Sequence, residues 1–172
     1  MSLKPRQFTP FNISIRNNFQ YGDLGIVLSL HGELYHREYG FDHHFEAYVA
    51  AGLAEFAQNY HTKKSSLWIA ESKNNAIGTI AILERPHHHA QLRWFLIVPD
   101  FRGLKLGRHL LKEAVQFCRD CGYKEIFLWT LDQLEAAKAI YLGNGFKLVE
   151  RKESHIWGKH LIEERYILKL QE

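Results

Sequence analysis

The sequence is poor in cysteine, carries little net charge and contains no long apolar run. Two cysteines in 172 residues cannot supply a disulfide framework, and no stretch approaches the roughly 18 consecutive apolar residues of a membrane-spanning helix. No apolar run follows Lys4 and Arg6, so we expect no secretory signal. The net charge of +3 (22 Lys and Arg against 19 Asp and Glu) is too weak and too scattered for a nucleic-acid-binding surface. These absences predict a cytoplasmic protein that binds neither membranes nor nucleic acid.

The overall composition is typical of one globular domain. Apolar residues make up 46% of the chain and charged residues 24%, and 172 residues are too few for two full domains. Histidine is the exception, with 11 copies. The run His87–His89 follows a proline without cysteine or acidic partners, and the other histidines are dispersed, so we expect no metal site. We interpret the histidines as a source of pH sensitivity.

Cys118 and Cys121 form a Cys-x-x-Cys pair, the spacing of half a zinc site or of a redox pair. Both lie on the apolar stripe of an expected helix that also carries Leu110 and Ala114. No second pair completes a set of four ligands. We therefore expect both thiols to pack in the core.

Periodicity and turn residues divide the chain into strands and helices. The strands are expected at residues 13–19, 67–71, 76–83, 91–98, 125–130, 146–150 and 161–170, and the helices at 24–30, 42–58, 106–121 and 134–142. Antiparallel strands come first, and strand–helix–strand crossovers follow. This order predicts an α/β (α+β) fold with one mixed central sheet and helices on both faces. We expect residues 1–11 to be an N-terminal extension and residues 12–172 to be a single domain.

Local signals mark several boundaries. Asp42 is expected to cap the helix that follows it, and Gly122 to end the long helix before it. Lys73–Asn75 is typical of a hairpin turn. The strand at 91–98 is apolar along nearly its whole length, so we expect it at the centre of the sheet, covered on both faces.

The loop before the third expected helix is the most informative segment. It joins a buried strand to a long helix and carries Gly103, and Gly107 follows in the first helical turn. Backbone N–H groups and the positive end of the helix dipole point into such a loop, and Arg102, Lys105 and Arg108 add positive charge. The arrangement is typical of a diphosphate site. An ordinary strand-to-helix turn would also explain the two glycines.

Two segments match known motifs. The first, Arg102-Gly-Leu-Lys105-Leu-Gly107, is similar to Arg/Gln-x-x-Gly-x-Gly/Ala, with lysine where glycine is usual. The second runs from Ala137 to Phe146 and is similar to Ala-x-x-Leu-Tyr-x-x-x-Gly-Phe. Both motifs belong to the GNAT superfamily of acetyl-CoA-dependent N-acetyltransferases, which the chain resembles from its first expected strand to its last.

Shorter segments resemble the acetyltransferase half of bacterial proteins that fuse a MarR-type DNA-binding domain to a GNAT domain. These segments lie at residues 34–42, 128–130 and 157–158. The chain is too short for the DNA-binding half as well. The resemblance therefore implies a bacterial acetyltransferase domain that stands alone.

The GNAT resemblance implies direct transfer of the acetyl group from acetyl-CoA to a primary amine, with no metal. Tyr141 corresponds to the acid that protonates the leaving thiolate, although a buried aromatic residue at the end of a short helix would produce the same motif. The strand residues expected to meet the pantetheine arm and the thioester are Leu96, Ile97 and Val98. The residues expected to hold the diphosphate are Arg102, Gly103, Leu104, Lys105, Leu106, Gly107 and Arg108.

Two positions depart from the family pattern. Lys105 costs about 1 kcal/mol if the loop needs a positive φ there, and otherwise its ammonium can reach a phosphate. Leu134 stands where relatives commonly carry an asparagine that touches the cofactor. Both departures concern cofactor affinity. A catalytically silent acyl-CoA-binding sensor or scaffold therefore stays open as an alternative to the enzyme.

The acceptor side is less well defined. The expected central strand offers no carboxylate as general base, which leaves Glu33, Glu84 and His31 as candidates. Arg93 lies in that apolar strand and needs a partner, either a glutamate of this chain or a carboxylate of the acceptor. Our hypothesis is that Arg93, with Glu33, meets the acceptor, and that residues 31–45 cover its pocket. The sequence does not identify the amine and leaves a homodimer open.

Overall fold

A computed structural model describes residues 6–8, 12–61 and 63–170. Its centre is an eight-stranded sheet in the order β1-β2-β3-β4-β5-β6-β8-β7. The strands are β1 (Arg6–Phe8), β2 (Ile13–Arg16), β3 (Ser66–Ser72), β4 (Asn75–Arg85), β5 (His89–Ile97), β6 (Glu125–Leu131), β7 (Lys147–Ile156) and β8 (Lys159–Lys169). Neighbouring strands are antiparallel except β5 and β6, which run parallel, so the sheet is mixed.

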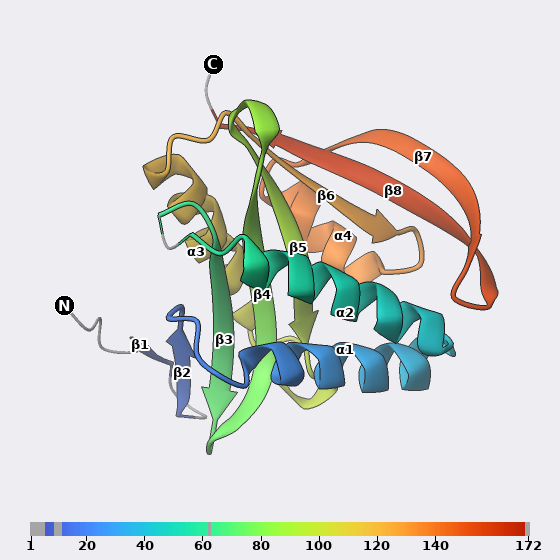
Figure 1. Cartoon of the computed structure of the whole chain (residues 1–172), viewed down its shortest axis with the longest axis horizontal. Coiled ribbons are helices and arrows are strands. Elements are labelled where there is room, and N and C mark those ends of the chain that lie inside the picture. Colours follow the sequence, from blue (N-terminus) through green and yellow to red (C-terminus); the bar gives the residue numbers. More distant parts are fainter. Residues whose placement is uncertain (1–5, 9–11, 62, 171–172) are drawn as a thin grey trace.

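Helices cover both faces of this sheet (Figure 1). α1 (Asp23–Tyr39) and α2 (His43–Gln58) pack on one face, and α3 (Leu106–Asp120) and α4 (Glu135–Gly143) on the other. Each layer has its own apolar cluster, one around Val49 and Leu53 of α2 and one around Leu110 and Leu111 of α3. Single helical turns, Pro86–His88 and Pro99–Phe101, flank β5. The predicted fold class is confirmed.

The predicted local signals are present in the structure. The Asp42 carboxylate accepts a hydrogen bond from the His44 N–H at 2.9 Å and caps α2. Gly122, with φ of 74°, follows α3, and the Gly122 N–H donates to the Arg119 carbonyl in a Schellman-type end. Lys73 and Asn74 both have positive φ, the geometry of a two-residue hairpin turn.

Three predicted element boundaries were wrong. The helix expected at 24–30 continues to Tyr39. His31 lies on the buried face of this helix between Val27 and Leu34, and because histidine is polar, the apolar pattern gave no sign that the helix continues. β2 ends at Arg16, where the guanidinium turns to the Asp23 carboxylate at 2.6 Å. β7 extends to Ile156 rather than residue 150, because most of its side chains are exposed and show no apolar alternation.

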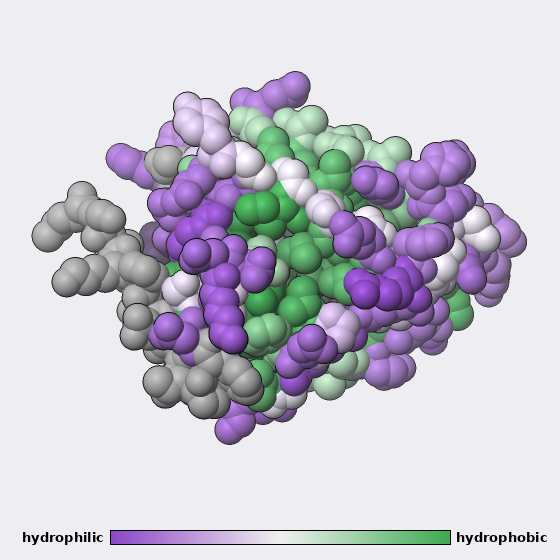
Figure 2. Space-filling view, turned by 90° about the horizontal axis from the view of Figure 1, so that it is seen from below, coloured by the Kyte–Doolittle hydropathy of each residue, from purple (hydrophilic) through white to green (hydrophobic). Residues whose placement is uncertain are grey.

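The described part of the predicted extension 1–11 contributes a strand. Arg6–Phe8 forms β1 and pairs with β2 at the edge of the sheet, and the rest of the extension lies outside the described residues. No helix in the described ranges is long and apolar enough to cross a bilayer. On the face seen from below, on the side of α1, apolar side chains gather at the centre and polar ones surround them (Figure 2).

The Cys-x-x-Cys pair packs as expected. Cys118 is fully buried, and burial raises the pKa of its thiol. Cys121 is half-buried, and its thiol donates to the Lys63 carbonyl at 3.1 Å. Within the described ranges, no group of three or more His, Cys, Asp or Glu residues could hold a metal ion.

The two central strands separate along their length. β5 pairs with β6 only over His89–Gln91 and Glu125–Phe127, although both strands continue beyond. β5 also bulges, because Thr79 and Ala81 of β4 face Leu96 and Arg93 across one extra residue of β5. Among the β5 side chains that line this opening, Gln91, Arg93 and Phe95 are half-buried, whereas Leu92 and Trp94 are buried. The strand was expected to be covered on both faces, but only every second side chain, such as those of Leu92, Trp94 and Leu96, is buried.

Candidate functional site

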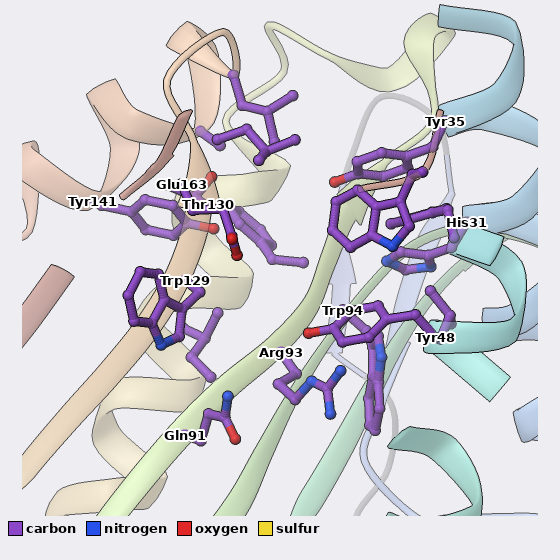
Figure 3. Close-up of a pocket in the computed structure, with 18 residues that line it drawn as sticks. His31, Tyr35, Tyr48, Gln91, Arg93, Trp94, Trp129, Thr130, Tyr141 and Glu163 are labelled. Carbon is purple, nitrogen blue, oxygen red and sulfur yellow. The ribbon is translucent and has the colours of Figure 1, made fainter. Parts of the chain in front are cut away.

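A cleft occupies the space where β5 and β6 part (Figure 3). Its floor is formed by the strand residues 91–95 and 129–131. Its walls come from elements far apart in the sequence: α1, α2, α4 and the β7–β8 hairpin. The wall side chains include His31, Tyr35, Phe45, Tyr48, Leu134, Tyr141, Trp157 and Glu163. Only the fold brings these side chains together.

Tyr141 is the predicted acid, and it lies in this cleft. Its ring is 4% exposed and packs against Phe95 and Phe146, with centroids 5.8 Å away in each case. Its hydroxyl points into the cleft from the side opposite Tyr35 (Figure 3), and it has no hydrogen-bond partner among the described residues. Burial, with a smaller effect of the Tyr35 phenol, raises the pKa of Tyr141. The hydroxyl is therefore protonated at neutral pH and available as a donor.

The predicted diphosphate loop leads into α3 with free donors. Lys105 caps α3 with φ of 63°, and no side chain caps the helix. The N–H groups of Leu106, Gly107 and Arg108 are therefore left without helical acceptors, as in any first helical turn. Gly107 is buried, and a Cβ there would lie 3.1 Å from Ile140 of α4. Glycine thus lets α3 approach α4 closely. The N–H groups in the first turn of α3 remain available to bind an anion.

Arg102 has partners within the protein. Its Nε donates to the Ile97 carbonyl at 2.9 Å, and its Nη2 pairs with Glu38 of α1 at 2.8 Å. Val98 donates its N–H to Ile77 at 2.9 Å, so two of the backbone groups expected to meet pantetheine are already bonded. Arg102 ties the loop to β5 and α1, and the charge that faces the loop comes from Lys105 and Arg108, both exposed.

His31 is the one candidate base that borders the cleft. It is 3% exposed, and its Nδ1 lies 2.9 Å from the Val27 carbonyl, which assigns the proton to Nδ1 and leaves the lone pair on Nε2. Burial lowers the pKa of His31 to about 4, the Val27 carbonyl opposes this shift, and the Arg93 charge adds to it. The ring stacks on Tyr35. His31 is thus a neutral imidazole at physiological pH.

Two other predicted residues lie elsewhere. Glu33 is exposed on α1, accepts a hydrogen bond from Ser29 at 2.7 Å and does not line the cleft. Glu84 is exposed near the far end of β4. Glu163 is the one carboxylate among the described residues that line the cleft. Sequence reasoning missed it because alternating charges on β8 gave no sign of which residue faces inward.

Arg93 lines the cleft, and its role toward an acceptor stays a prediction. Its guanidinium carbon lies 5.1 Å from the Tyr48 ring centroid and 4.9 Å from that of Trp94. Tyr48 and Trp157 were not predicted as site residues. The signal for Tyr48 was an aromatic residue at an exposed position of α2, where it is 49% exposed.

Comparisons with known proteins agree with this geometry. The model of the acetyltransferase (GNAT) family matches residues 31–146, and the chain belongs to this family. An uncharacterised N-acetyltransferase of Schizosaccharomyces pombe is 32% identical over 145 residues, which are 82% of this chain and 86% of that protein. Rat N-acetyltransferase 8F1 is 32% identical over 112 residues, 60% of this chain and 51% of its own length. The chain thus spans about half the length of the mammalian relatives it matches.

Solved structures share the fold. An acetyltransferase of the GNAT family from Staphylococcus aureus superposes with a TM-score of 0.75 at 21% identity, covering 92% of this chain and 99% of the other. An acetyltransferase from Salmonella typhimurium, solved with its cofactor acetyl-CoA, has a TM-score of 0.72 at 16% identity, covering 94% and 95%.

Replacing Lys105 by glycine should stabilise the protein. Lysine at φ of 63° is strained, whereas glycine adopts this region freely, so we expect the free energy of unfolding to rise by up to about 1 kcal/mol. Urea denaturation measures the change. The matched control is Arg108→Gly in the first turn of α3, which should lower the free energy by about 1 kcal/mol. Lys105→Gly lowering it as well would contradict the strain argument.

The His31 pKa makes stability depend on pH. The folded-state pKa of about 4 lies below the ordinary value of 6.5, so the unfolded chain takes up a proton first as the pH falls. The free energy of unfolding should drop by about 3 kcal/mol through His31 between pH 7 and pH 4. The variant His31→Gln should lose this pH-dependent contribution, whereas the control His43→Gln, at an exposed position, should keep it. Urea denaturation at pH 7 and pH 4 measures the free energy of unfolding of each variant. An equal drop in wild type and His31→Gln would contradict the prediction.

Proposed function

We propose that this chain is an acetyl-CoA-dependent N-acetyltransferase that moves the acetyl group directly to a primary amine. The observation that carries the proposal is the Tyr141 hydroxyl, protonated and unpartnered in a cleft between parting strands. Membership in the GNAT family supports the same activity. So do the named N-acetyltransferases among the relatives.

The donor groups on this chain fit acetyl-CoA. Three N–H groups in the first turn of α3 have no helical acceptor and suit a diphosphate, with Lys105 and Arg108 beside them. Beyond Gln91, the backbone groups of β5 that face β6 have no ladder partner and suit the amides of a pantetheine arm. The Salmonella neighbour holds acetyl-CoA in the same fold. The proposal gives no role to a metal.

The chemistry follows from the position of Tyr141. The amine nitrogen forms a bond to the thioester carbonyl carbon, the carbon–sulfur bond breaks, and the electron pair leaves on sulfur. Tyr141 gives its hydroxyl proton to the thiolate, and its high pKa then favours its return to the neutral phenol. The amine loses a proton to His31 or to water in the cleft. Atoms and charge balance without a covalent enzyme intermediate.

A silent acyl-CoA-binding sensor or scaffold is the second candidate. The strained Lys105 and the apolar Leu134, which begins α4 without a side-chain cap, favour it because both depart from the family's cofactor-binding pattern. The two candidates differ in one measurement. The sensor binds acetyl-CoA and releases no thiol with any amine.

Three further expectations remain predictions. They are a cytoplasmic location, the relationship to the acetyltransferase half of bacterial MarR–GNAT proteins, and a homodimer. The matched relatives come from bacteria, yeast and mammals.

Removing the Tyr141 hydroxyl tests the acid. We expect Tyr141→Phe to lower kcat roughly 100- to 1,000-fold, because the thiolate then leaves unprotonated, and to leave acetyl-CoA affinity within about twofold. Thiol release with an amine panel measures kcat, and calorimetry measures binding. The matched control is Tyr123→Phe, which also loses one hydroxyl, bonded to Lys64 at 2.6 Å outside the cleft. It should keep kcat. An unchanged kcat for Tyr141→Phe would contradict the role of Tyr141 as the acid.

A further inference from the structure

The Arg93 side chain occupies a notch formed by Gly52, Tyr48 and Trp94. It leaves β5 toward α2, where Gly52 is buried, and a Cβ at Gly52 would lie 2.5 Å from Nη1 of Arg93. Any other residue at this position would displace the guanidinium. The ring centroids of Tyr48 and Trp94 lie 5.1 and 4.9 Å from the guanidinium carbon. Cation–π contacts therefore fix its position without neutralising it.

This cation has no counterion. Among the described residues, no carboxylate pairs with Arg93. The carboxylate that lines the cleft, Glu163, accepts a hydrogen bond from Ser154 and lies 3.4 Å from the Lys152 ammonium. A half-buried charge without a partner is costly, so its retention in a shaped notch points to an anion supplied by a ligand.

The position of Arg93 assigns that anion to the acceptor. The loop that suits the CoA diphosphate follows β5 after Ile97, four residues beyond Arg93, a span of roughly 13 Å along a strand. Arg93 lies on the opposite side of the bulge, next to Tyr48 and the α1–α2 layer (Figure 3). No residue of this loop lines the cleft, so the diphosphate site proposed at the loop lies apart from Arg93.

Aromatic surfaces bound the space next to Arg93. Trp157, at the tip of the β7–β8 hairpin, packs on Phe45 at 4.8 Å and on Tyr48 at 5.3 Å between centroids. The Asp42 N–H donates to the Trp157 carbonyl at 3.2 Å and holds the hairpin tip against the start of α2. A ligand whose anion reaches Arg93 thus has flat apolar walls beside it, which suit an apolar side chain.

We infer that Arg93 is a carboxylate-binding residue and that the acceptor is a free amino acid with an apolar side chain. The inference rests on the proposed acetyl transfer. The carboxylate binds the guanidinium, the side chain lies against Tyr48 and Trp157, and the amine faces the thioester. The Arg93 cation also selects against simple amines, which enter as ammonium ions of like charge.

Matched ligand pairs test the inference without turnover. Leucine and phenylalanine, each against its decarboxylated amine, are titrated into CoA-saturated protein by calorimetry. We expect each amino acid to bind roughly 10- to 100-fold more tightly than its amine. Arg93→Met should remove the difference and keep the affinity for CoA, and Arg93→Lys should restore part of it, since lysine keeps the charge but not the fork. Arg119→Met, at an exposed arginine on α3, should change nothing.

Two readouts separate this inference from the proposed function. Equal binding of both members of each pair by the wild type overturns the carboxylate subsite, whatever the variants do. Thiol release is measured with the same ligands and acetyl-CoA. Release with amines and no preference for amino acids overturns the subsite and leaves acetyl transfer standing. Preferential binding of amino acids with no thiol release from any ligand supports the subsite and overturns acetyl transfer.

Discussion

Three residue pairs join the two halves of the sheet, His89–Gln91 of β5 with Glu125–Phe127 of β6. Each half has antiparallel ladders of its own, so the parting of β5 and β6 leaves one row of backbone groups on each strand without a ladder partner. Buried groups of this kind are costly unless something bonds them. Side chains from four other elements gather around the opening and form walls instead of closing it. The cleft follows from this single separation.

Backbone strain lies at the two ends of the same strand–loop segment. Trp94, in the bulge of β5, has φ of 49°, and Lys105, before α3, has φ of 63°, which together cost about 2–4 kcal/mol. The indole N–H of Trp94 is also buried without a partner among the described residues. Packing of α3 on the sheet through the fully buried Leu110 and Leu111 offsets these costs. Two of the positive-φ residues thus lie next to Arg93 and the loop donors.

The sequence was a good guide wherever chemistry is local. The Asp42 cap, the loop before α3 and Tyr141 each lie within one short motif, and the structure has the cap, the loop and Tyr141 where the motifs indicate. Tyr48 and Trp157 are about 110 residues apart, so no periodicity links them, and only the contact of the hairpin tip with the start of α2 brings them together. Arg93 could be singled out from the sequence because a charge in an apolar strand is unusual. The notch at Gly52 could not be predicted, because it depends on how α2 packs on the sheet.

The charges of the cleft constrain the protonation state of an acceptor. Arg93 is an unpaired cation, His31 is held neutral partly by that charge, and the phenols of Tyr35 and Tyr141 are protonated. An ammonium ion that enters alone is repelled by Arg93, whereas a zwitterion brings a carboxylate that screens it. Binding of that carboxylate also removes part of the field that lowers the His31 pKa, which makes the imidazole a better proton acceptor when an amine is present. In the proposed acetyl transfer, one unpaired arginine would therefore link acceptor choice to the removal of the amine proton.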